Sequence, residues 1–426
     1  MNIFEEVESQ VRSYSRSFPT VFTTAKNARL HSRDGQSYID FLAGAGTLNY
    51  GHNNDHFKQP LLDYIQADGI THGLDMYTDA KEGFLNAFTD IVMRPRDMDY
   101  KVQFTGPTGT NAVEVALKIA RKAKGRTGIV SFTNGYHGCT LGSQAVTGNK
   151  GQRSGAVVSL GDVTRIPYDD YGDESDDFMG LKLLDQMLCD PGSGVEVPAG
   201  VIVETVQGEG GLNAARMLWL QQLESLCRKH DMLLIIDDIQ AGCGRTGTFF
   251  SFEPAGIKPD IVTLSKSLSG YGLPFAITLL RPELDNWEPA EHNGTFRGNN
   301  LAFITARVAL EKYWQTDDFS DEIKTKAKVI EERFQRIIDS SDESMTLKGR
   351  GMMRGIGMPN GDLASAVCKH AFKNGLIVET SGSWGEVVKC LCPLTIPMAD
   401  LNEGLDILED AFDQVLNKKH DQAKAS

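Results

Sequence analysis

Residues 233–274 begin Leu-Leu-Ile-Ile-Asp-Asp-Ile-Gln (233–240), turn through Ala-Gly-Cys-Gly-Arg-Thr-Gly (241–247), and end Thr-Leu-Ser-Lys-Ser-Leu-Ser-Gly-Tyr-Gly-Leu-Pro (263–274). Asp237 ends one apolar strand and Lys266 follows another, Ile261 to Leu264, with glycines close behind each. A buried acid is costly unless a positive group meets it, and a lysine before a glycine-rich loop is free to reach into a cleft. The stretch therefore predicts two strand ends that present opposite charges to one site.

An acid and a lysine in this arrangement suggest pyridoxal phosphate chemistry. That cofactor requires a carboxylate that keeps its ring nitrogen protonated and a lysine that forms a Schiff base. The simpler interpretation is a strand-end Asp237 at a loop and a solvated Lys266, because most charged side chains lie at the surface. The order of the other motifs along the chain decides between the two interpretations.

Size, charge and cysteine content exclude several classes of protein. The chain has 426 residues, enough for two or three domains, and a net charge of -14, which argues against a nucleic-acid or anionic-membrane partner. Seven scattered cysteines suit a reducing compartment, and no histidine or cysteine spacing indicates a metal site. No apolar run approaches the roughly 18 residues of a membrane span, and the acidic N-terminus is unlike a signal peptide. We expect a cytoplasmic protein.

Short apolar strands alternate with helix-length segments up to about residue 300, which predicts an α/β fold with a mostly parallel sheet covered on both faces. Helices are predicted for 111–123, with a capping box at Asn111 and Glu114 and a stop at Gly125, and also for 321–338, 363–373 and 401–417. The expected strands are Lys101 to Phe104, Gly128 to Phe132, Gly200 to Val206, Met232 to Asp237, Ile261 to Leu264, Phe275 to Leu280, Leu376 to Thr380 and Val387 to Leu391.

Two glycine-rich segments are candidates for phosphate binding. Thr105-Gly-Pro-Thr-Gly-Thr110 lies between a predicted strand and a predicted helix, where backbone N–H groups suit an anion, although an ordinary turn has the same composition. Gly242-Cys-Gly-Arg-Thr-Gly247 matches the dinucleotide pattern, but the aromatic residues and proline that follow it do not begin a convincing helix. The first segment is therefore the better phosphate candidate.

These motifs, in this order and over nearly the whole chain, closely resemble the class III, or ω-amino-acid, aminotransferases of the fold-type I pyridoxal phosphate enzymes. The resemblance implies a large domain (56–310) with a mostly parallel seven-stranded sheet sandwiched by helices. It also implies a smaller α+β domain (311–426), which an N-terminal segment (1–55) joins. The implied cofactor is pyridoxal 5′-phosphate, with no metal.

The resemblance also implies a role for each site residue. Lys266 would form the Schiff base and Asp237 would pair with the ring nitrogen. The other expected cofactor contacts are Gly109 and Thr110 to the phosphate, Tyr136 and Ile239 to the two ring faces, Gln240 near the phenolic oxygen, and Thr295 to the phosphate of the neighbouring subunit. A homodimer or higher homo-oligomer with shared active sites follows.

One departure from the family pattern concerns substrate binding. Lys389 stands where relatives use an arginine for the substrate α-carboxylate, and lysine lacks the bidentate fork of arginine. Glu209 matches the family acid that pairs with that arginine. The switch between substrates would then be a pair of Glu209 and Lys389, or be made elsewhere.

Within the family, residues 40–52, 104–114 and 291–300 are similar to the aminotransferases that form L-2,4-diaminobutyrate in ectoine biosynthesis. This similarity implies amino transfer from L-glutamate to L-aspartate 4-semialdehyde, which also yields 2-oxoglutarate. The alternatives are a diaminobutyrate enzyme outside ectoine synthesis, an ornithine, acetylornithine or 4-aminobutyrate aminotransferase, and an aminomutase or decarboxylase of the same fold. A catalytically silent scaffold would be expected to have lost Asp237 or Lys266.

Overall fold

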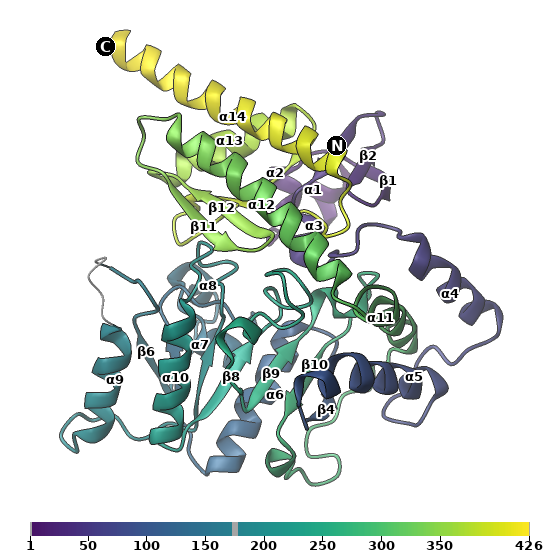
Figure 1. Cartoon of the computed structure of the whole chain (residues 1–426), viewed down its shortest axis with the longest axis vertical. Helices are drawn as coiled ribbons and strands as arrows, with labels where there is room; N and C mark the ends of the chain where they lie inside the picture. The colour runs from purple at the N-terminus through teal and green to yellow at the C-terminus, as the bar shows by residue number, and fades with distance from the viewer. Residues whose placement is uncertain (1, 173–177, 426) are drawn as a thin grey trace.

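A seven-stranded sheet forms the centre of the lower part of the molecule in Figure 1. In spatial order its strands are β4 (Lys101–Phe104), β10 (Ile277–Leu280), β9 (Ile261–Leu264), β8 (Leu233–Asp237), β7 (Gly200–Val203), β5 (Ile129–Phe132) and β6 (Val163–Ile166). β10 is antiparallel to both of its neighbours, and the other neighbouring strands are parallel. The predicted mostly parallel seven-stranded sheet is confirmed.

The computed structural model describes residues 2–172 and 178–425, with side chains up to residue 416. Helices cover both faces of the central sheet. Ile235 belongs to a core cluster that includes Ile119 of α6 (Gly109–Lys124), whereas Leu234 and Ile236 share a second cluster with Trp219 of α10 (Met217–Lys229). Strands buried on both faces have continuous apolar runs, which is why the sequence pattern indicated α/β.

The remaining helices of the lower part flank this sandwich. α4 and α5 pack against α11 at one end, and α9 packs against β6 at the other. Their bounds are α4 Asp55–Gln66, α5 Asp79–Ala87, α7 Leu141–Val146, α8 Lys150–Ser154, α9 Met179–Cys189 and α11 Asn300–Tyr313. Short helical turns lie at Phe88–Met93, Arg94–Arg96, Glu253–Ala255, Lys266–Ser269, Pro282–Leu284 and Thr295–Arg297. None of the helices in the described ranges has the length and apolar character needed to cross a membrane.

Two four-stranded sheets build the upper part of Figure 1. One contains β1 (Phe22–Lys26), β2 (Arg29–Ser32), β3 (Ser37–Asp40) and β13 (Leu376–Ile377), and the other β11 (Thr346–Arg350), β12 (Met353–Gly357), β15 (Val387–Cys390) and β14 (Glu379–Ser381). The helices there are α1 (Ile3–Val7), α2 (Tyr14–Ser17), α3 (Ala43–Gly46), α12 (Asp318–Asp339), α13 (Gly361–Lys373) and α14 (Met398–Ala425). Because β3 pairs with β13, N-terminal and C-terminal segments share a sheet. The domain boundaries at 55 and 310 stay a prediction.

Two local predictions were wrong. The expected strand Leu376 to Thr380 is two strands in different sheets, β13 and β14, and this break places Glu379 directly opposite Lys389 across the β14–β15 pair. The expected capping box at Asn111 is absent, because α6 begins earlier, with Thr108 as its N-cap residue. Asn111 instead donates an amide hydrogen bond to the Thr108 hydroxyl at 2.7 Å.

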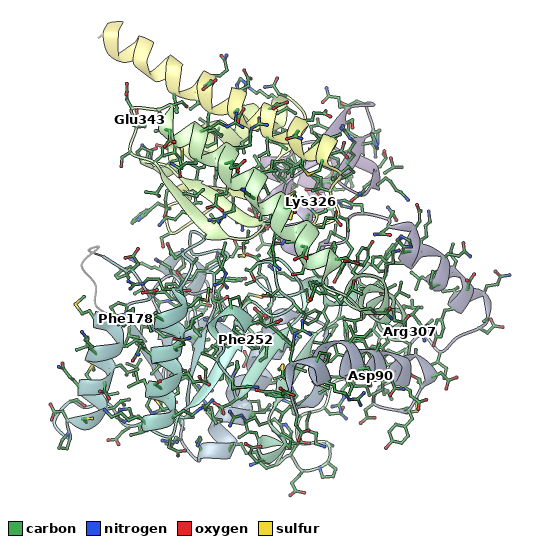
Figure 2. All side chains as sticks on the ribbon, viewed as in Figure 1. Asp90, Phe178, Phe252, Arg307, Lys326 and Glu343 are labelled. Atoms are coloured by element: carbon green, nitrogen blue, oxygen red, sulfur yellow. The ribbon has the colours of Figure 1, made fainter. Side chains whose placement is uncertain are left out.

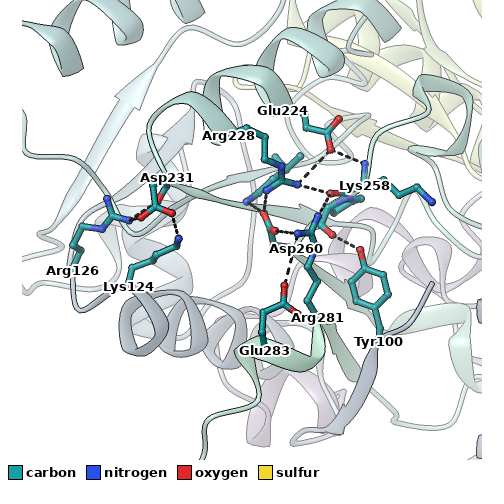
Figure 3. A network of polar contacts seen from close by, with 12 residues as sticks. Tyr100, Lys124, Arg126, Glu224, Arg228, Asp231, Lys258, Asp260, Arg281 and Glu283 are labelled. Carbon is teal, nitrogen blue, oxygen red and sulfur yellow. Dashed lines mark hydrogen bonds and ion pairs between the residues drawn. The ribbon is translucent and has the colours of Figure 1, made fainter. Parts of the chain in front are cut away.

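A polar network lies at the amino ends of β8 and β9, opposite the carboxyl ends near Asp237 and Lys266 (Figure 3). Asp260, just before β9, accepts hydrogen bonds from Arg228 at 2.6 Å and from the Leu234 backbone at 2.7 Å, and forms an ion pair with Arg281 at 3.3 Å. The network ties the first residues of β8 to β9. It thereby leaves the carboxyl ends of these strands for a site, as is usual in parallel sheets.

The glycine-rich segment 242–247 joins the two parts of the molecule. Arg245 is completely buried and donates hydrogen bonds to Asn49 and to the backbone oxygens of Cys392 and Met352. Burial lowers the pKa of Arg245 to about 10. No helix begins at Gly247 in the described chain, so the dinucleotide interpretation fails. Within the upper part, Lys326 of α12, which Figure 2 labels, donates a buried hydrogen bond of 2.8 Å to the Leu394 backbone.

Candidate functional site

A cavity of about 230 Å³ lies at the carboxyl ends of β5, β7, β8 and β9. Eight of the ten predicted site residues line it, namely Gly109, Thr110, Tyr136, Glu209, Asp237, Ile239, Gln240 and Lys266. The other lining residues are Thr108, His137, Gly138, Cys139 and Glu204. The fold therefore gathers segments that lie up to 158 positions apart in the sequence, from Thr108 to Lys266, around one space.

Two predicted residues lie outside this cavity. Thr295 is exposed on the helical turn Thr295–Arg297, and Lys389 is completely buried behind Glu209. A larger hollow of about 950 Å³ is lined by residues of α5, β4 and segment 285–297, and none of the ten predicted residues lines it. The smaller cavity is the candidate site because it alone, among the described hollows, brings the lysine, the acids and a helix N-terminus together.

The N-terminus of α6 supplies free backbone donors at one end of the cavity. Thr108, the N-cap residue, makes no capping hydrogen bond with its side chain, and within the described chain the N–H groups of Gly109 and Thr110 donate none either. A side chain at Gly109 would place its Cβ 3.0 Å from Ile239 Cδ1, so Ile239 would have to shift to admit any residue larger than glycine there. Unpaired N–H groups and the helix dipole together make an anion site suited to phosphate.

Asp237 is held by three donors. Its Oδ2 lies 2.7 Å from His137 Nδ1, while Oδ1 accepts hydrogen bonds from the Thr263 hydroxyl at 3.2 Å and the Ile239 backbone at 3.3 Å. Burial lowers the pKa of His137, but the hydrogen bond and charge of Asp237 outweigh burial and raise it overall. A protonated His137 stabilises a negative charge on Asp237, which can then bind a cationic ring nitrogen.

Glu204 is a second buried acid beside this pair. Its carboxylate accepts hydrogen bonds from the backbone N–H groups of Tyr136 at 2.9 Å and Gly208 at 3.0 Å. Burial, reinforced by the charge of Asp237, raises the pKa of Glu204 to about 7 although His137 acts against it. The two hydrogen bonds fix the strand ends that carry Tyr136 and Glu209.

Lys266 is held by a loop from the N-terminal segment. Its φ of 48° lies in the left-handed region, which is strained for a lysine, and its Nζ donates a 2.9 Å hydrogen bond to the Ala45 carbonyl. Burial lowers the pKa of Lys266, and Lys389 adds to this effect, while Glu209 opposes it. The lowered pKa favours a free amine, the form that acts as nucleophile and base.

The loop that carries Ala45 is itself fixed by Asp40. Asp40 Oδ1 accepts hydrogen bonds from the backbone N–H groups of Leu42 at 2.9 Å and Ala43 at 2.8 Å, and Oδ2 pairs with His52 at 2.8 Å. Ala43 and Ala45 both have positive φ angles, so the loop needs such support. The Ala45 carbonyl also accepts a hydrogen bond from Gln240 at 3.1 Å, and thereby joins Lys266 and Gln240.

Lys389 is buried between two glutamates. Its Nζ lies 3.0 Å from Glu209 Oε1 and 2.9 Å from Glu379 Oε1. Burial lowers the pKa of Lys389, but the two carboxylates outweigh burial and raise it. The expected pair of Glu209 and Lys389 is present, and the structure adds Glu379 as a third member.

Sequence reasoning missed the roles of three residues here, namely His137, Glu204 and Glu379. A hairpin pattern, two apolar strands around Ser-Gly-Ser-Trp-Gly (381–385), could have placed Glu379 opposite Lys389. Pairs such as His137 with Asp237, 100 residues apart, leave no such signal.

The fold also brings together Asp185, Cys189 and His230, a group whose ligand-type atoms lie within 4.8 Å of one another. No spacing in the sequence indicated this group. Lys229 already contacts both Asp185 oxygens, at 2.7 Å and 2.8 Å, and His230 shares one of them at 2.6 Å. The Lys229 ammonium and a ring nitrogen of His230 therefore already bind the Asp185 carboxylate.

Known proteins are similar to this chain over nearly its whole length. The family model described as aminotransferase class-III matches residues 11–412. A diaminobutyrate--2-oxoglutarate transaminase of Halomonas elongata is 59% identical, with 97% of this chain and 99% of the relative covered. A protein of the same name from Vibrio parahaemolyticus is 57% identical, with 99% and 100% covered.

Solved structures share the whole fold. The ornithine aminotransferase of Toxoplasma gondii, crystallised with partial occupancy of PLP at its active site, has a TM-score of 0.84 and 25% identity, with 98% of this chain and 94% of that chain covered. An S-selective transaminase of an Arthrobacter species has a TM-score of 0.85 at 21% identity, covering 98% of each chain, which shows the fold alone. The chain belongs to the class III aminotransferases.

Proposed function

We propose that the cavity binds pyridoxal 5′-phosphate and transfers amino groups with Lys266 as its covalent anchor. When bound, this cofactor withdraws electrons from a substrate carbon and so makes a proton there removable. The observation that carries the proposal is the coincidence, in one cavity, of the unpaired N–H groups of α6, the fixed carboxylate of Asp237 and the amine of Lys266.

The residues fit the chemical groups of this cofactor. The N–H groups of Gly109 and Thr110 would bind its phosphate, and Asp237 would bind the ring nitrogen. Tyr136 and Ile239 would contact the ring faces, since both line the cavity and carry flat or branched apolar groups. Gln240 Oε1 is buried without a hydrogen-bond partner in the described chain, and it lies where a polar group of the cofactor could meet it.

Lys266 would move the proton during the reaction. Its lowered pKa favours the free amine, the form that can take a proton from a substrate carbon and return it. The Ala45 carbonyl holds Nζ in place until substrate arrives. The 2.7 Å contact between His137 Nδ1 and Asp237 Oδ2 would keep this carboxylate oriented toward the ring nitrogen.

The names of the most similar relatives indicate the substrates. Relatives at 55–59% identity over nearly the whole chain are diaminobutyrate--2-oxoglutarate transaminases. We propose that this enzyme transfers the amino group of L-glutamate to L-aspartate 4-semialdehyde, giving L-2,4-diaminobutyrate and 2-oxoglutarate, as the first committed step of ectoine synthesis. The ornithine aminotransferase resemblance, at 25% identity, supports the fold and cofactor more than the substrate.

A second subunit would complete each site. Thr295 is exposed, beside Phe296, whose side chain is 66% exposed. Segment 72–77 packs against this loop through a hydrogen bond from Gly73 to Gly298 and exposes Met76 and Tyr77. A cluster of exposed apolar side chains indicates a protein interface. We propose a homodimer in which Thr295 reaches the phosphate bound by the partner.

A panel of amino acceptors tests the proposed function. With L-glutamate as donor, we expect aspartate 4-semialdehyde to give diaminobutyrate and one equivalent of 2-oxoglutarate, at a kcat/KM well above those for glutamate semialdehyde and succinate semialdehyde. Equal kcat/KM values for all three would contradict the substrate assignment and leave the aminotransferase class intact. Product formation without 2-oxoglutarate would point to an aminomutase or decarboxylase instead.

A further inference from the structure

The buried ammonium of Lys389 is enclosed by three oxygens. These belong to Glu209 at 3.0 Å, Glu379 at 2.9 Å and the Gly208 carbonyl at 3.3 Å. Hydrogen bonds to Glu209 and Gly208 use two of the three N–H donors of the ammonium, and the ion-pair contact with Glu379 covers it on a further side, so little room is left for a substrate carboxylate while both glutamates stay in place. The cluster also holds two carboxylates against one ammonium, and therefore presents an excess of negative charge.

Glu379 is the fixed partner of Lys389. The two residues are direct cross-strand neighbours on β14 and β15, and the Glu379 side chain is only 12% exposed. Burial, with the charges of Glu379 and Glu209, raises the pKa of Tyr14 of α2, so this hydroxyl stays neutral near the pair. Glu379 does not line the cavity.

Glu209 is the carboxylate of this cluster that faces the cavity. Its side chain is 31% exposed and lines both the main cavity and an adjoining hollow of about 160 Å³. Burial raises the pKa of Glu209, but the charges of Lys389 and Lys266 hold it at about 2. The hydrogen bonds from Lys389 and Gln240 both go to Oε1, and within the described residues Oε2 accepts none.

A chain of hydrogen bonds through Gln240 and the Ala45 carbonyl connects Glu209 to the amine of Lys266. Gln240 Nε2 is 3.2 Å from Glu209 Oε1 and 3.1 Å from the Ala45 oxygen, which in turn is 2.9 Å from Lys266 Nζ. A substrate whose carbon reacts beside Lys266 would extend its remaining groups toward this carboxylate. A second ammonium on that substrate would find a charged acceptor there.

We propose that Glu209 binds the second ammonium group of a diamino acid, and that Glu379 permits this by remaining the counter-ion of Lys389. The inference rests on the proposed function, since both diaminobutyrate and aspartate semialdehyde carry an α-ammonium away from the reacting carbon. Without Glu379, Glu209 would be the only carboxylate partner of Lys389 and would be held there, because an unpaired buried charge is strongly disfavoured. Glu379 is thus a positioning residue for Glu209.

The test compares L-2,4-diaminobutyrate with 4-aminobutyrate, which has the same chain, reacting amine and carboxylate and lacks only the α-ammonium. Single-turnover rates are followed by the absorbance of the bound cofactor in the holoenzyme. Glu209→Gln is expected to lower the preference for diaminobutyrate over 4-aminobutyrate by about 10- to 100-fold, the worth of a hydrogen bond to a charged group.

A rescue experiment tests the role of Glu379. Glu379→Gln is expected to lower the same preference less than Glu209→Gln does, because Lys389 then retains Glu209. Adding Lys389→Met to Glu379→Gln removes the buried charge and should restore the preference to within about threefold of wild type. Glu332→Gln, on the exposed face of α12, is the matched control and should behave as wild type.

The outcomes separate the inference from the proposed function. Equal losses with both amines in Glu209→Gln would overturn the ammonium site. A doubly substituted enzyme that binds cofactor normally and yet shows no restored preference would overturn the role of Glu379. A wild-type enzyme that converts neither diaminobutyrate nor aspartate semialdehyde would instead refute the proposed function.

Discussion

Asp237 is a buried carboxylate whose position is fixed by its hydrogen-bond partners. Three donors fix its two oxygens, and His137 among them is buried with a raised pKa. Removing a single partner from such a pair leaves the other buried and unsatisfied. The residue thus depends on its neighbours for both its position and its charge.

We expect His137→Asn to lower kcat about 10- to 100-fold, because one charge-assisted hydrogen bond to Asp237 contributes roughly 1.5–3 kcal/mol. The variant should also bind cofactor more weakly, as measured by titrating cofactor-free enzyme. His370→Asn, a replacement at a partly exposed histidine on α13, is the control. An unchanged kcat in His137→Asn would contradict the role of this pair.

Glu204 predicts a pH dependence of stability. Its pKa is about 7 in the folded protein against an ordinary glutamate value of 4.5, so the folded state binds more protons between these pH values. Stability is therefore lost as the pH rises from about 4.5 through 7, by up to ~3 kcal/mol from this group. Glu204→Gln does not titrate and should lack this loss. Unfolding midpoints of both proteins from pH 5 to 8 check it, and parallel curves would contradict it.

The first turn of helix α6 is the candidate phosphate site. Its first turn has unpaired N–H groups, and a Cβ at Gly109 would lie 3.0–3.1 Å from two atoms of Ile239. The sequence placed this turn correctly between a strand and a helix, and it placed Asp237 and Lys266 at strand ends. The residue where α6 begins was not predicted, because the capping pattern at Asn111 and Glu114 competes with the earlier start at Thr108.

We expect Gly109→Ala to weaken cofactor binding about 10-fold or more, because the added methyl must displace Ile239, and overpacking costs roughly 1–3 kcal/mol. Cofactor titration measures this effect. Gly155→Ala, at a glycine with nothing within 4 Å of the added Cβ and an ordinary negative φ, is the matched control. Equal affinities in the two variants would argue against the α6 phosphate site.

The whole molecule shows why the substrate side of the site was harder to predict than the cofactor side. Cofactor residues sit at the ends of strands in one sheet, whose parallel order follows from the sequence pattern. The residues around the substrate side of the cavity come from separate parts of the molecule, with Glu209 after β7, Lys389 on β15 and Ala45, which holds Lys266, in α3. The contacts among these segments depend on how two sheets and a central sandwich pack, which no local pattern records.

Shared active sites predict complementation between inactive subunits. A dimer of one Lys266→Ala chain and one Thr295→Glu chain contains one site with both changes and one site with neither. Random reassociation of the two variants should therefore recover about a quarter of wild-type activity, since half of the dimers are mixed. Either variant alone is the control, and no recovery in dimers shown to be mixed would contradict a shared site.

The central claim is that Lys266 carries the cofactor in this cavity. Borohydride reduction of the holoenzyme fixes the cofactor to the lysine that holds it, and peptide mapping by mass spectrometry then identifies that residue. We predict one modified lysine per chain, Lys266, and none in the Lys266→Ala variant. Modification of another lysine, or loss of the cofactor without any modified peptide, would contradict the account.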